Sequence, residues 1–88
     1  MELLYALAAF SDTSTAAMAR RILQENDCDC VFMPTPRDIS TDCGLSLRYS
    51  PDRAAEAREL IEQIITKPDQ CLFYTVYRSE GKRVYIQS

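Results

Sequence analysis

The chain has 88 residues, of which 47% are hydrophobic and 26% are charged, and its net charge at pH 7 is -3. These values are typical of one globular domain, here residues 1–88, and exclude a largely disordered protein. The acidic balance argues against a nucleic-acid-binding protein, because a polyphosphate partner requires a clustered basic surface and no basic run in this chain exceeds two residues.

The N-terminal apolar run and the cysteines indicate where the protein works. The run from Leu3 to Phe10 is too short to span a bilayer and has no basic segment before it, so we expect a cytoplasmic protein without membrane association. The four cysteines are then expected to be reduced thiols. The chain contains no histidine, which excludes a Cys–His hydrolase and removes the commonest metal ligand.

The first half of the chain predicts a strand, a helix and a second strand. Residues 3–10 are continuously apolar, as in a buried strand. Thr13 or Ser14 can cap a helix that ends near Glu25. The short apolar run 30–33 predicts a second strand, which the two prolines that follow would stop.

The second half predicts a further helix and three strands. Residues 44–49 alternate between apolar and polar side chains, which indicates a half-buried strand. The segment 50–52, Ser-Pro-Asp, is a typical helix start, and this helix is expected to run to about Thr66. Residues 71–77 predict a fourth strand, and a glycine-containing turn leads into a short fifth strand at 83–86.

This element order predicts an α+β fold of the ferredoxin-like βαββαβ type with an added C-terminal strand, although an open α/β layer is the alternative. The expected antiparallel sheet has the strand order 4-1-3-2 and both helices on one face. Cys43 and Cys71 would then lie at one end of the sheet, near the start of the first helix. Cys28 and Cys30 would lie at the opposite end, so we expect no four-cysteine metal site.

The segment between the second and third strands, PTPRDISTDCGL at residues 34–45, presents the candidate reactive thiol, Cys43. The N-terminus of a helix favours a nearby thiolate, and Arg37 would add a full positive charge. Gly44 has no side chain, which allows a partner or the loop backbone to approach closely. Cys43 also has the same strand parity as Leu45 and Leu47, so a small hydrophobic residue in the core is the alternative interpretation.

The same segment closely resembles the signature of a small bacterial family named as putative selenium/sulfur carrier-like proteins. In that family a P-x-P-R-x-I-S segment leads to a Cys-Gly pair. The resemblance covers Pro34, Pro36, Arg37, Ile39, Ser40, Cys43 and Gly44, and extends upstream to Phe10-Ser11 and Ala17-Met18.

The resemblance implies that Cys43 is a carrier thiol, which holds sulfur or selenium as a persulfide or selenopersulfide. The donor would be an enzyme such as a cysteine desulfurase or a selenocysteine lyase, and the acceptor is unknown. The transfer needs no metal or cofactor and makes the protein a carrier rather than an enzyme. Arg37, Ser40 and the first-turn amides of the first helix would stabilise the anionic sulfur, and Cys71 is the candidate second thiol.

Two other functions fit the same residues. A protein-interaction module would use the proline-rich loop as a docking surface, with a structural Cys43. A small-molecule sensor would bind its ligand between paired sheets, and the tyrosines expected on the open sheet face leave a homodimer open.

Overall fold

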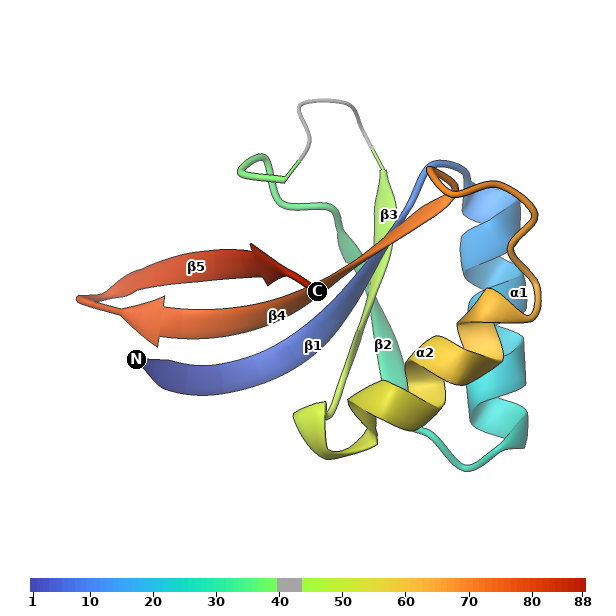
Figure 1. Cartoon of the computed structure of the whole chain (residues 1–88), viewed down its shortest axis with the longest axis horizontal. Helices are drawn as coiled ribbons and strands as arrows, with labels where there is room; N and C mark the ends of the chain where they lie inside the picture. The colour runs from blue at the N-terminus through green and yellow to red at the C-terminus, as the bar shows by residue number, and fades with distance from the viewer. Residues whose placement is uncertain (40–43) are drawn as a thin grey trace.

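The computed structural model describes residues 1–39 and 44–88 (Figure 1). In these ranges the chain forms β1 (Glu2–Phe10), α1 (Thr13–Glu25), β2 (Cys30–Pro34), β3 (Leu45–Tyr49), the 3-10 turn η1 (Pro51–Arg53), α2 (Ala54–Glu62), β4 (Cys71–Ser79) and β5 (Lys82–Gln87). None of the helices in these ranges is long and apolar enough to cross a membrane.

The five strands form one antiparallel sheet with the order β2-β3-β1-β4-β5. An α+β fold is therefore confirmed, and the first four strands have the expected neighbours. The fifth strand extends the sheet beyond β4. Phe10, at the end of β1, lies opposite both Leu45 at the start of β3 and Cys71 at the start of β4, so three strand ends meet at one end of the sheet.

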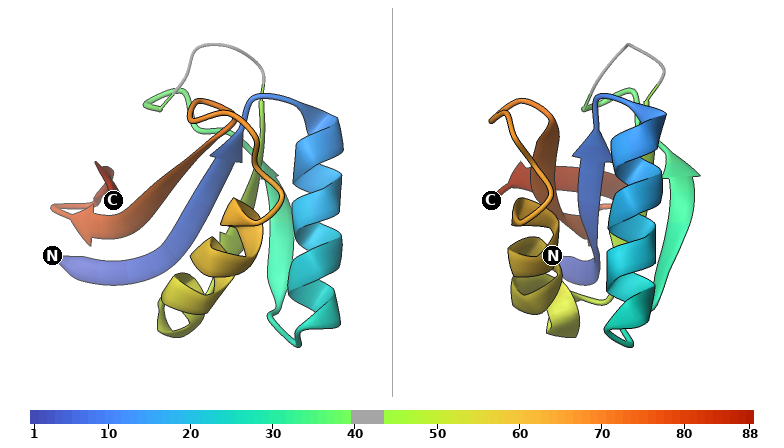
Figure 2. Two further views of the ribbon diagram at one scale, coloured as in Figure 1. Left: turned by 45° about the vertical axis from the view of Figure 1, so that its right-hand side comes forward. Right: turned by 90° about the vertical axis from the view of Figure 1, so that its right-hand side faces the viewer.

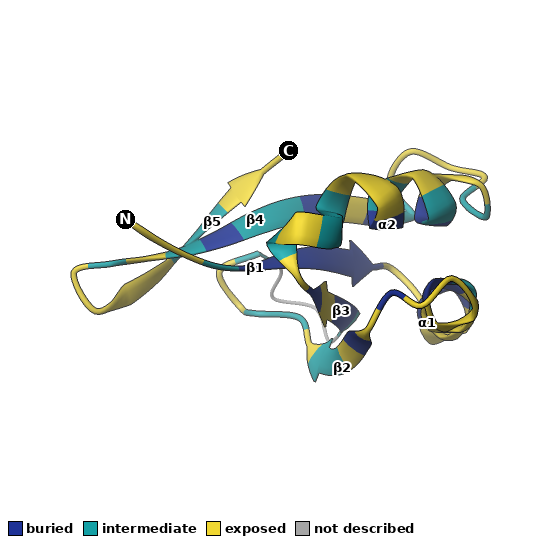
Figure 3. Cartoon of the chain, turned by 90° about the horizontal axis from the view of Figure 1, so that it is seen from below, coloured by how far each residue is buried: buried dark blue, intermediate teal, exposed yellow. Residues whose placement is uncertain are grey.

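The main hydrophobic core lies between the sheet and the two helices (Figures 2 and 3). Side chains alternate between the faces of a strand, and Ala6, Ala8 and Phe10 of β1 belong to this core. Leu23 of α1 and Ile61 of α2 are fully buried against them. Burial of each such side chain stabilises the fold by about 1.5–3 kcal/mol.

A second, smaller hydrophobic cluster covers the opposite face of the sheet. Its buried residues are Tyr5, Leu7 and Val76, and Ile39 from the β2–β3 loop packs against them. Figure 1 shows the N-terminal half of β1 and the hairpin β4–β5 extending beyond the helices, where β1 has a register irregularity between Leu3 and Tyr5. This face is therefore partly closed by the chain itself.

The second helix is shorter than the sequence predicts, because α2 ends at Glu62 and not near Thr66. The side-chain oxygen of Gln70 accepts hydrogen bonds from the backbone N–H groups of Thr66 and Lys67, at 2.9 and 3.3 Å. Pro68 also disfavours a helical conformation of the residue before it. The backbone groups that would extend the helix are thus bonded to the next loop.

Candidate functional site

The β2–β3 loop begins and ends at the end of the sheet where Phe10 lies opposite Leu45 and Cys71. Its described parts are residues 35–39 and Gly44. Ser40 and Cys43, two of the predicted site residues, lie outside the described residues, so their roles stay predictions. The geometry of the site is given by the residues on both sides of them.

The base of this loop is closed by Thr35, which sequence reasoning did not single out. The Thr35 backbone N–H donates to the Gly44 carbonyl at 3.0 Å, and the Thr35 hydroxyl shares a hydrogen bond with the Ser46 hydroxyl at 2.7 Å. A threonine two residues before Arg37 gives no sequence signal for this contact. Gly44, the covalent neighbour of Cys43, is therefore hydrogen-bonded to the residue that directly follows β2.

Gly44 lies where there is little room for a side chain. A β-carbon at this position would lie 3.0 Å from the Thr35 Oγ1 atom and 3.3 Å from the Phe10 carbonyl oxygen. The sequence left two uses open for Gly44, a close approach of the loop backbone or of a partner. The structure shows the first, because Gly44 lies close to Thr35 and Phe10 of its own chain. The glycine allows the loop base to close.

Arg37 occupies a tight turn in the first part of the loop. The Ile39 N–H donates to the Pro36 carbonyl at 3.0 Å, and Arg37 and Asp38 between them are exposed. Ile39 packs into the second hydrophobic cluster, beside Tyr5. The turn thus presents the Arg37 side chain to solvent, and its contact with Cys43 stays a prediction.

The N-terminus of α1 is capped by Asp12, and not by Thr13 or Ser14 as expected. The Asp12 carboxylate accepts the Thr15 N–H at 2.7 Å and the Thr15 hydroxyl at 2.9 Å. The Thr15 backbone hydrogen bond holds the pKa of Asp12 below its usual value. A carboxylate therefore already occupies part of the first turn, which weakens the electrostatic support that this helix can give to a thiolate.

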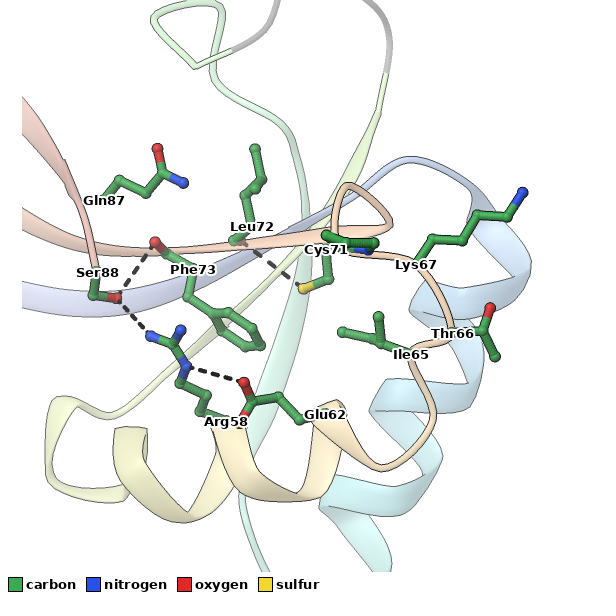
Figure 4. A pocket seen from close by; sticks show the side chains of 11 residues that line it. Arg58, Glu62, Ile65, Thr66, Lys67, Cys71, Leu72, Phe73, Gln87 and Ser88 are labelled. Atoms are coloured by element: carbon green, nitrogen blue, oxygen red, sulfur yellow. Dashed lines mark hydrogen bonds and ion pairs between the residues drawn. The ribbon is translucent and has the colours of Figure 1, made fainter.

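Cys71 lies on the helix-facing side of β4, beside a cavity of about 450 Å³ (Figure 4). Its residue is 5% exposed, and burial raises the pKa of its thiol to about 12. The Sγ atom lies 3.9 Å from the Leu72 carbonyl oxygen. The thiol is therefore protonated near neutral pH, which argues against a fast nucleophile, and its role as a second thiol stays a prediction.

Arg58 and Glu62 of α2 form the charged wall of this cavity, with their side chains 3.5 Å apart. The Arg58 guanidinium also lies 4.6 Å from the centre of the Phe73 ring. Both charges are thus already engaged, which leaves Cys71 in a largely apolar setting between β4 and α2.

Cys28 and Cys30 lie near the opposite end of the sheet, where Cys30 pairs with Tyr49. Both residues are buried, and burial raises the pKa of each thiol. Within residues 1–39 and 44–88 there is no group of three or more side chains suited to hold a metal ion. These two cysteines act as core residues in the described structure.

Comparison with protein families gives one match, to the model described as putative Se/S carrier protein-like, over residues 5–72. The comparisons with curated proteins and with solved structures give no match. The matched range includes β1 from Tyr5 on, both helices, the β2–β3 loop and the first two residues of β4. Because the match covers most of the chain, the protein belongs to the putative Se/S carrier protein-like family.

Proposed function

We propose that this protein carries sulfur or selenium on Cys43, as a persulfide or selenopersulfide, from a donor enzyme to an acceptor. The observation that carries the proposal is the state of the other thiols. Cys28, Cys30 and Cys71 are free and buried, and burial raises the pKa of each. The family match supports the assignment, because its range includes Cys43.

The transfer requires only thiol chemistry. The Cys43 thiolate attacks the terminal sulfur of a persulfide on the donor enzyme, so that a new S–S bond forms at Cys43. The S–S bond on the donor breaks, and the donor cysteine leaves as a thiolate. No net oxidation or reduction takes place, and the terminal proton stays on the transferred sulfur. Attack by an acceptor thiolate repeats the exchange, and selenium follows the same step.

The residues around the loop suit this step. Arg37 is exposed on its turn and would stabilise the anionic sulfur by a charge-assisted hydrogen bond, as would the Ser40 hydroxyl. Thr35 and Gly44 close the base of the loop, which holds the backbone of Gly44, the covalent neighbour of Cys43. An exposed loop on a rigid base is suited to reach into the active site of a donor enzyme.

The same proposal includes the partners, the compartment and the detailed fold class. The donor is of the cysteine desulfurase or selenocysteine lyase type. The free thiols of Cys28, Cys30 and Cys71 are consistent with the reducing cytoplasm. The strand order β2-β3-β1-β4 supports a ferredoxin-like unit in which β5 is an addition at the β4 edge. The protein acts as a carrier and not as an enzyme.

The test is mass spectrometry of the intact protein after incubation with a cysteine desulfurase and cysteine, and separately with a selenocysteine lyase and selenocysteine. A variant with Cys28, Cys30 and Cys71 replaced by alanine retains only Cys43 as a thiol. We expect one added sulfur or selenium atom on this variant and on the unmodified protein. Cys43→Ala, which keeps the three buried thiols, is the matched control and should gain no mass.

Alkylation provides a second readout that needs no donor enzyme. Near neutral pH iodoacetamide should modify Cys43 in the native protein, and the three buried cysteines only after unfolding in urea. A protein that gains no mass from either donor and resists alkylation at Cys43 would exclude the carrier function. The loop would then be the docking surface of an interaction module with a structural cysteine.

A further inference from the structure

A second cavity, of about 470 Å³, lies away from the β2–β3 loop. It opens around the part of the sheet where Tyr5 of β1 and Arg48 of β3 lie, near the end at which Cys30 pairs with Tyr49. Its volume is within the range of small-molecule sites. The proposed carrier function makes no use of this cavity.

Three arginines line the cavity, and they come from three strands. Arg48 lies on β3, Arg78 on β4 and Arg83 on β5, whereas Asp29 is the one acidic residue in the lining. The chain as a whole has a net charge of -3, so this basic cavity is a local exception. A concave surface with one sign of charge attracts ligands of the opposite sign.

The placement of these arginines is unfavourable without a ligand. Arg78 and Arg83 lie directly opposite each other in the β4–β5 hairpin, and like charges at such positions destabilise a hairpin. Glu2 lies 3.6 Å from Arg78, and both side chains are more than half exposed. In the described part of the chain, Arg48 and Arg83 have no carboxylate within ion-pair distance. Their charges are available to an anion.

Tyr5 also lines this cavity. The residue is 9% exposed and its hydroxyl is fully buried, so the ring and not the hydroxyl borders the cavity. The Arg48 guanidinium lies over the Tyr5 ring, 5.3 Å from its centre, which holds this arginine at the cavity wall.

We propose that this cavity binds a small molecule with two linked oxyanion groups, for which a diphosphate is the simplest model. One group would accept hydrogen bonds from Arg48, which lies over the Tyr5 ring at the cavity wall. The other would be held by Arg78 and Arg83, which lie on the other side of β1 in the sheet order. The planar guanidinium matches an oxyanion with paired hydrogen bonds, which a lysine ammonium cannot provide.

The test is a titration with inorganic pyrophosphate at low ionic strength, followed by NMR of the backbone amides. We expect saturable shifts near Tyr5, Arg48, Arg78 and Arg83, and weaker binding of orthophosphate, which offers one group only. Arg48→Gln and Arg83→Gln should each weaken pyrophosphate binding about tenfold, as loss of a charged hydrogen-bonding group does.

Two further variants separate binding from general effects of charge and folding. Arg21→Gln removes an exposed arginine on α1, and pyrophosphate binding should not change. Tyr5→Phe removes only the buried hydroxyl and keeps the ring beneath Arg48, so neither pyrophosphate binding nor stability should fall. Each variant is checked for a native amide spectrum, which is expected because the three cavity arginines are exposed.

The proposal is overturned if pyrophosphate gives no saturable shifts, or if Arg21→Gln weakens binding as much as Arg48→Gln. Equal affinities for orthophosphate and pyrophosphate would overturn the assignment of two oxyanion groups. The result does not depend on sulfur transfer, because the probe is an inorganic anion and all four cysteines are retained.

Discussion

Replacing Gly44 with alanine perturbs the base of the loop at its tightest point. The new β-carbon would lie 3.0 Å from the Thr35 Oγ1 atom and 3.3 Å from the Phe10 carbonyl oxygen. The carbonyl belongs to the end of a central strand and has little freedom to move. The Thr35 hydroxyl must therefore give way, and it is bonded to the Ser46 hydroxyl at 2.7 Å.

The magnitude follows from three contributions to the free energy of unfolding. Overpacking costs about 1–3 kcal/mol. Ser46 is fully buried, so a broken bond to Thr35 would leave its hydroxyl unpaired at a cost of about 1–3 kcal/mol. Alanine reduces the entropy of the unfolded chain, which gains about 0.4–1 kcal/mol. The first two costs are not additive, because relaxation of the site that relieves one of them incurs the other. We therefore expect the free energy of unfolding to fall by about 1–3 kcal/mol in total.

Urea unfolding, followed by circular dichroism, measures this loss directly. The same glycine substitution is then made in a background with Thr35→Ala and Ser46→Ala, which removes both hydroxyls and leaves no unpaired group. The Phe10 carbonyl is then the one tight contact left, because the β-carbon of residue 35 lies at an ordinary 3.5 Å, so the cost should fall below about 1 kcal/mol. An equal cost in both backgrounds, or no cost in either, would refute the reasoning.

Four other substitutions test the capping, burial and turn geometry. Asp12→Ala should lower the free energy of unfolding above pH 3.8, because it removes the helix cap. The difference from the unmodified protein should shrink at lower pH, where acid protonates the Asp12 carboxyl, whose pKa is lowered in the native state. Urea titrations at several pH values measure both effects. The free energy of unfolding should fall between about pH 9 and 12, because Cys71 loses its proton near pH 9 in the unfolded state and only near 12 in the native state. Cys71→Ala should flatten this fall. Glu80 has a φ of 53° in a two-residue hairpin turn, so Glu80→Asn should raise the melting temperature. Gly81→Ala, at a φ of 77°, should lower it.

Much of the fold could be predicted from local sequence pattern. The continuous apolar run that became β1 and the alternation that became β3 each fix a strand by their own periodicity, since neighbouring side chains point to opposite faces. Pro34, the last residue of β2, and Pro36 just beyond it mark the end of that strand, one residue later than predicted, and the Ser-Pro-Asp start marks the approach to α2. The helix ends were less predictable, because side chains outside the helices accept hydrogen bonds from their backbone N–H groups. Asp12 accepts from Thr15 at the start of α1, and Gln70 accepts from Thr66 beyond the end of α2.

The candidate site was predictable to the extent that its residues are close in the sequence. The Cys43-Gly44 pair and Arg37 lie within one loop, and the family resemblance that this segment carries is confirmed by the match over residues 5–72. The burial of Cys71 could not be predicted from its strand alone. Its environment depends on α2, which packs on that face from a different part of the chain.

The sequence by itself determined which segments become strands and helices and which segment carries the family signature, because these depend on residues that are neighbours in the chain. Only the tertiary structure decided that Thr35 closes on Gly44 and that Arg48, Arg78 and Arg83 line one cavity. Such contacts arise from the register of antiparallel strands, which brings distant residues to adjacent positions. Strand pairing is a property of the whole sheet, and no single segment encodes it.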